Sequence, residues 1–190
     1  MALLASAEDQ IIGGPWNTIF GETTSQVEAK IMRSNSSLEL QTIPGQQIRI
    51  TSKVIVAGET FDCGAFLFSN DRINNKFGMC MFDKTVQYEN IFSNHLNYTQ
   101  AEQWLVSNQY RIAQIINPIK RMITSKYGNP IKDSDDNIRW RSSNGNIIEI
   151  EVIRNVNIAE RDESFTREFG CLPAFSIILT YVVGSNIPDF

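Results

Sequence analysis

The acidic run that begins at Asp133 is the stretch whose residue types come closest to a ligand-binding motif. Asp133, Asp135 and Asn137 match the Asp-x-Asp-x-Asn opening of a calcium loop, in which carboxylate and amide oxygens coordinate the ion. Such a loop also needs a glycine, where this chain has Ile138, and a closing glutamate, where it has Asn144. The sequence therefore predicts a solvated turn before a strand, and a weak calcium site is the alternative.

A second group of carboxylates follows on an expected strand. Glu149 and Glu151 alternate along it, and paired carboxylates can perform general acid–base catalysis. Alternation on the solvent side of a strand explains them without a catalytic role. An enzyme that combines Glu149–Glu151 with the segment Asp133–Asn137 is therefore an alternative function rather than the favoured one.

The other reactive side chains do not form a recognised catalytic or metal motif. His95 is the single histidine and no nucleophile motif accompanies it, so neither a catalytic triad nor a histidine-rich zinc site is expected. Cys63, Cys80 and Cys171 lack C-x-x-C spacing, and three buried thiols are expected rather than a disulfide. Phosphate-binding and dinucleotide-binding motifs are also missing, so no cofactor is expected.

Length and composition are those of a globular protein. The 190 residues are 42% hydrophobic and 20% charged, which suits a domain with a sizeable core. We expect a lead-in over residues 1–20 and one domain over residues 21–190, with two small units, 21–96 and 97–190, as the alternative. The net charge of -4 is dispersed, which argues against a nucleic-acid partner. No apolar run reaches the roughly 20 residues of a transmembrane segment.

The first residues predict the cellular location of the protein. Ala2–Ala7 is typical of the end of a signal peptide with an Ala-x-Ala cleavage site. The basic start of a signal peptide is missing, so residues 1–7 would be a signal remnant. We therefore expect a secreted or periplasmic protein, and a cytoplasmic protein with a short opening helix is the alternative.

One long amphipathic segment predicts a helix from Thr99 to Tyr127. Thr99 and Glu102 have the spacing of a capping box, which satisfies backbone N–H groups at a helix start. Pro118 falls inside the apolar stripe and removes a backbone hydrogen bond. Because the stripe stays in phase across the proline, one kinked helix is favoured over two helices that meet there.

A shorter helix is expected over Thr24–Arg33. Thr23 with Gln26, and Ser25 with Glu28, both have capping-box spacing. Runs of β-branched and aromatic residues predict the strands, at residues 38–43, 47–56, 61–68, 73–82, 138–150 (a hairpin) and 175–183. The pattern predicts an α+β fold in which the two helices cover a mostly antiparallel sheet, with two α-then-β units as the alternative arrangement.

The two expected hairpins differ in their turns. An Asn70-Asp71 turn would pair Phe68 with Ile73 and leave the strand at residues 61–68 apolar on both faces, which is typical of a central strand covered on both sides. In the later hairpin, a three-residue loop, Ser143–Gly145, with Gly145 in the left-handed region, pairs Trp140 with Ile148. A two-residue turn would instead pair Trp140 with Glu149, which mixes core with solvent.

Two short motifs resemble those of small exported bacterial α+β proteins. They are Lys126-Tyr127-Gly128-Asn129-Pro130 followed by Trp140, and Gly21-Glu22-Thr23 with Val27. The group includes the small lipoprotein of outer-membrane β-barrel assembly and the β-lactamase inhibitor proteins. In that group the two motifs bracket one helical segment, whereas here they lie far apart. The resemblance implies tandem helix-plus-sheet units and a non-enzymatic protein that binds another protein.

The favoured function is therefore a non-catalytic binding or assembly subunit that acts through protein–protein contacts or self-association. A calcium-dependent binder or carboxylate enzyme is the first alternative, and a structural subunit of a large assembly is the second.

Overall fold

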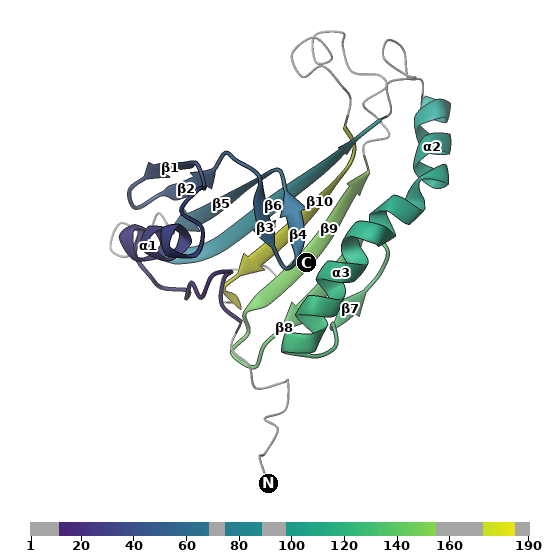
Figure 1. Ribbon diagram of the computed structural model, residues 1–190. Coiled ribbons are helices and arrows are strands. Elements are labelled where there is room, and N and C mark those ends of the chain that lie inside the picture. The colour runs from purple at the N-terminus through teal and green to yellow at the C-terminus, as the bar shows by residue number, and fades with distance from the viewer. Residues whose placement is uncertain (1–11, 69–74, 89–97, 155–172, 185–190) are drawn as a thin grey trace.

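The computed structural model describes residues 12–68, 75–88, 98–154 and 173–184 (Figure 1). The helices are α1 (Thr24–Ser34), α2 (Tyr98–Ser107) and α3 (Gln109–Tyr127). The strands are β1 (Leu40–Ile43), β2 (Gln47–Ile50), β3 (Val54–Val56), β4 (Glu59–Phe61), β5 (Cys63–Phe68), β6 (Phe77–Gln87), β7 (Lys132–Asp133), β8 (Asn137–Arg141), β9 (Ile147–Arg154) and β10 (Pro173–Val182). The predicted α+β class is confirmed. Residues 1–7, His95 and Cys171 lie outside the described residues.

Eight of these strands form one antiparallel sheet in the order β1-β2-β5-β6-β10-β9-β8-β7, while β3 and β4 form a separate hairpin. The predicted mostly antiparallel sheet is confirmed. The apolar strand expected at residues 175–183 is β10, and it lies between β6 and β9. The ladder between β6 and β10 joins the first half of the chain to the second.

One face of the sheet carries the hydrophobic core. A row of buried side chains crosses six neighbouring strands in register, namely Ile48, Phe66, Cys80, Tyr181, Ile148 and Trp140. Buried residues of α1, α2, α3 and the β3–β4 hairpin belong to the same cluster. In Figure 1, α1, the hairpin and α3 lie on the near side of the sheet. The described helices therefore pack on a single face.

The short helix α1 confirms the sequence prediction, including its start. The Thr23 side chain accepts a hydrogen bond from the Gln26 N–H, and the Gln26 side chain accepts one from the Thr23 N–H at 2.9 Å. Val27 and Ile31 are fully buried on the face toward the sheet. A capping box with an apolar stripe is local enough to be recognised without knowledge of the fold.

A single long helix over the sheet is not confirmed, because α2 and α3 are separated at Asn108. The Asn108 side-chain amide donates to the Trp104 carbonyl at 2.9 Å, and an asparagine bonded to the preceding turn competes with regular helix. Instead of dividing at Pro118, α3 continues through it. In addition, α2 begins at Tyr98, so Thr99 lies inside the helix rather than at the predicted N-cap.

The hairpin of β8 and β9 has the predicted three-residue loop. Gly145 is left-handed with φ of 84°, and the Ser142 N–H donates to the Asn146 carbonyl at 2.9 Å to close the loop. Trp140 pairs with Ile148 as expected. The prediction of a three-residue loop, which lets both strands bury side chains on the same face, is therefore confirmed.

The register of β5 and β6 differs from the prediction. Phe68 pairs with Phe77 and Phe66 pairs with Cys80, and a bulge in β6 leaves Gly78 without a partner on β5. The turn-like residues between the strands suggested a tight hairpin, but the connection is longer. The register is the one that buries Phe66 and Cys80 on the core face.

This register also changes which side chains share a face. Met79 and Met81 lie on the opposite face from Phe66, whereas the predicted pairing of Phe68 with Ile73 would place all three on one face. Cys80 is buried and free, whereas Cys63 is free and exposed, so the prediction of a buried thiol is wrong for Cys63. The predicted strand at residues 47–56 is also divided, into β2 of the main sheet and β3 of the hairpin.

Candidate functional site

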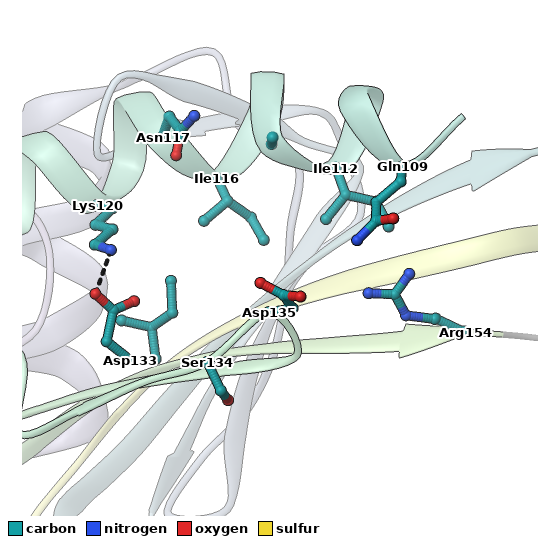
Figure 2. Close-up of a pocket in the computed structure, with 11 residues that line it drawn as sticks. Gln109, Ile112, Ile116, Asn117, Lys120, Asp133, Ser134, Asp135 and Arg154 are labelled. Atoms are coloured by element: carbon teal, nitrogen blue, oxygen red, sulfur yellow. Dashed lines mark hydrogen bonds and ion pairs between the residues drawn. The ribbon is translucent and has the colours of Figure 1, made fainter. Parts of the chain in front are cut away.

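Asp133 and Asp135, two of the carboxylates singled out in the sequence, line a cleft between α3 and the β7–β8 turn, and Figure 2 shows its lining. The cleft has a volume of about 310 Å³. It is lined by Gln109, Ile112, Ala113, Ile116, Asn117, Lys120, Asp133, Ser134, Asp135, Ile138 and Arg154. Ile112 and Ile116 project from α3 between the polar side chains, so the cleft has an apolar roof and an acidic edge.

The predicted calcium ligands are not brought together. Asp133 forms an ion pair with Lys120 at 2.5 Å. Asp133 pairs in register with the core-facing Ile138, so the next residue along β8, Asn137, points to the other face of the sheet. Asp135 lines the cleft without a hydrogen bond to any residue that the structure describes. Within the described ranges, no group of three histidine, cysteine or acidic residues is placed to hold a metal ion.

The glutamates of β9 lie outside this cleft. Glu149 accepts hydrogen bonds from Arg139 at 2.8 Å and from the Asn137 amide at 2.5 Å. Glu151 is exposed and lies opposite Asn137 in register. The two glutamates therefore face away from Asp133 and Asp135, and the structure does not join the acidic groups into one constellation.

A cysteine–carboxylate group that the sequence did not indicate lies at the junction of β5 and β6. Cys63 is opposite Asp83, and Asp62 precedes it in the chain. Partial burial raises the pKa of the Cys63 thiol, and the charges of Asp83 and Asp62 raise it further. A thiol in such surroundings stays protonated at neutral pH, which disfavours a nucleophilic role for Cys63.

The face of the sheet opposite the core carries a contiguous apolar surface, here called the outer face. Its apolar side chains are Ala65, Leu67, Met79, Met81, Ile178 and Val182, and Thr180 and Asp83 lie on the same face among them. These side chains are half-buried and do not belong to the core cluster of the helices. The strand at residues 61–68 is therefore central, but the described elements cover only its core face.

A further pocket lies on the core side, between the turn at Gly14–Asn17, the β3–β4 hairpin and the C-terminal end of α3. Its volume is about 230 Å³. Tyr181, from the central strand β10, is among its lining residues together with Lys126 of α3. Reasoning from the sequence did not find this pocket because its lining comes from four segments spread between Gly14 and Tyr181.

Comparisons of this chain with protein-family models, curated proteins and solved structures find no match. None of the described helices is long and apolar enough to cross a membrane.

Proposed function

We propose that this protein is a non-catalytic binding or assembly subunit that holds another protein chain against the outer face of its sheet. The observation that carries the proposal is the contiguous apolar surface on the central strands β5, β6 and β10, opposite the described helices. These side chains are half-buried, and apolar surface that stays partly accessible is typical of protein–protein interfaces.

The composition of the outer face suits a protein partner. Met79 and Met81 are flexible and polarizable, and methionine adapts to the shape of an opposing surface. Arg49 lies beside the apolar surface, opposite Ala65 on the neighbouring strand. A central apolar area with arginine at its border is the usual anatomy of an interface.

The acidic candidates support a structural role better than a catalytic one. Asp133 and Glu149 each have a cationic partner, Lys120 and Arg139 respectively. Partly exposed ion pairs of this type contribute about 0–1 kcal/mol each. Ion pairs of this kind are common where strands and helices meet solvent. The resemblance to exported proteins that bind other proteins implies the same kind of function.

The test is affinity capture from source lysate with the full chain, compared with Met81→Lys. Met81 lies between Ala65 and Thr180 in the register, so lysine at this position places a charge in the middle of the outer face. We expect the wild type to retain a stoichiometric partner and the variant to retain about tenfold less, because an interface must desolvate that charge.

The matched control is Val106→Lys, which adds the same charge on α2 where the side chain is 69% exposed. The control should retain the partner fully. Light scattering tests self-association in the same samples. If the molecular mass of the wild type rises with protein concentration and only Met81→Lys removes that rise, the partner is a second copy of the chain. Equal behaviour of the two variants, or a monomer with no partner, would overturn the proposal.

A further inference from the structure

The pocket beside Tyr181 is formed by four separate parts of the chain. Its lining comprises Gly14, Pro15, Trp16, Asn17, Ile55, Val56, Ala57, Met122, Ile123, Lys126, Tyr127 and Tyr181. An adjoining pocket of about 440 Å³ shares Gly14, Asn17, Lys126 and Tyr127 with it. Small-molecule sites typically have volumes of roughly 300–1,000 Å³ with mostly apolar walls and a few polar groups. The two pockets together fit that description.

Tyr181 supplies a buried polar group to this pocket. The residue is only 6% exposed, and its hydroxyl makes no hydrogen bond with a residue in the described part of the chain. Burial raises the pKa of Tyr181 far above its ordinary value, and Cys80 and Tyr127 add to that effect, so the hydroxyl stays protonated. Because Tyr181 lines the pocket and its hydroxyl has no partner among the described residues, this group can donate a hydrogen bond to a ligand in the pocket.

Lys126 gives the pocket its charge. Among the described residues that line the two pockets, it is the only charged one. Its Nζ lies 5.0 Å from the centre of the Tyr127 ring, and no described acidic side chain forms an ion pair with it. A lone ammonium beside an apolar cavity attracts a ligand that carries negative charge.

The apolar walls are built by groups that are exposed at the pocket mouth. Ile55 of the hairpin is 63% exposed, and Met122 of α3 is 48% exposed. The opposing wall has an unusual backbone, because Trp16 and Asn17 are both left-handed, with φ of 56° and 60°. The Trp16 ring contacts Phe66 at a centroid distance of 5.9 Å. Packing against the core therefore holds this strained turn in place.

We propose that this pocket binds a small organic acid with an apolar body, whose acidic group pairs with Lys126 and accepts a hydrogen bond from Tyr181. The apolar body would contact Ile55 and Met122 at the mouth. This site is on the core side of the sheet and does not depend on the proposed protein-binding function of the outer face.

The first experiment titrates the full chain with 1-anilinonaphthalene-8-sulfonate, a fluorescent apolar anion, and then displaces it with octanoate or octylammonium. We expect saturable binding to one site, displacement by octanoate, and little displacement by octylammonium. Lys126→Gln should weaken binding roughly tenfold, since it removes the charge-assisted contact. Tyr181→Phe should weaken it about fivefold, since it removes one hydrogen bond.

Two variants serve as controls. Arg121→Gln removes an exposed positive charge from the same helix but at a residue that lines neither pocket, and it should bind like the wild type. Met81→Lys alters the outer face and should also leave binding unchanged, which separates this proposal from the protein-binding one. Unchanged circular dichroism establishes that each variant is folded. The proposal is overturned if the wild type shows no saturable binding, or if Arg121→Gln or Met81→Lys weakens it as much as Lys126→Gln.

Discussion

Among the carboxylates that the structure describes, Asp83 has surroundings unlike those of an ordinary surface residue. It lies on the outer face, where its Oδ1 is buried and has no hydrogen-bond partner. Burial raises the pKa of Asp83, the charge of Asp62 raises it further, and a hydrogen bond from Thr85 opposes both effects. The ionised form of Asp83 is therefore disfavoured in the folded protein.

This environment predicts a pH dependence of stability. In the interval above the ordinary carboxyl pKa of 3.8, the folded state binds more protons at Asp83 than the unfolded state does. The contribution of Asp83 to the free energy of unfolding therefore decreases as the pH rises through that interval. Asp83→Asn should remove this decrease, and urea unfolding measured from about pH 4 to about pH 7 would detect the change in slope.

Asp135→Asn provides the comparison for that experiment. Asp135 is exposed and makes no hydrogen bond with another described residue, so its variant should keep the wild-type slope. If Asp83→Asn also kept it, the ionisation of Asp83 would not be coupled to folding.

At this scale the sequence indicates residue types but not their surroundings. Asp133 and Asp135 were singled out because adjacent carboxylates form a recognisable pattern, and both do line one cleft. Asp83, Lys126 and Tyr181 have no such pattern. Their properties arise only when helices and strands distant in sequence place them against a charge, a pocket or a buried neighbour.

Among the elements, the β8–β9 hairpin is the one whose geometry depends most clearly on a single residue. Gly145 is left-handed, and a Cβ added there would meet only the Gly184 Cα at 3.9 Å. Space is therefore available, and the restriction on this position is that of the backbone. Gly145→Ala should destabilise the protein by about 1–2 kcal/mol because alanine is strained in this region.

Gly145→Asn is the matched variant, because asparagine enters the left-handed region more readily. It should cost less stability than alanine in urea unfolding, with similar slopes for both variants. An equal cost for the two substitutions would show that contacts of the added side chain, rather than the backbone, decide the effect.

The elements also show where reasoning from sequence succeeds. The capping box of Thr23 and the loop at Gly145 depend on residues within a few positions, and both were predicted correctly. The β5–β6 register depends on a bulge at Gly78 and on burial against strands from the other half of the chain. The division at Asn108 depends on one side-chain hydrogen bond that an otherwise helical pattern conceals.

For the whole molecule, the important feature is that each half of the chain ends on a central strand. The order runs inward from β1 to β6 in the first half and from β7 to β10 in the second. Two α-then-β units over residues 21–96 and 97–190 are the predicted alternative to one domain. However, the long β6–β10 ladder and the shared core cluster cross that boundary. We therefore infer that the two halves fold together.

Leu179→Ala tests this inference. Leu179 is fully buried on β10 and lies between Phe82 of β6 and Ile150 of β9. The cavity should cost about 2–5 kcal/mol of unfolding free energy. If the sheet is one cooperative unit, hydrogen exchange of the most protected amides in β5 and in β8 should lose protection by the same amount, because both open only in global unfolding.

Ile43→Ala is the corresponding variant at the sheet edge, where the side chain is 44% exposed and little protection should be lost anywhere. If Leu179→Ala lowered the hydrogen-exchange protection of β8 but not that of β5, the two halves would unfold independently. In that case β6 and β10 would form an interface between two units, and the outer face would cross a boundary that can open. Equal loss in both strands would instead make the outer face a single rigid surface, which is the form that a binding subunit needs to hold a partner across β5, β6 and β10.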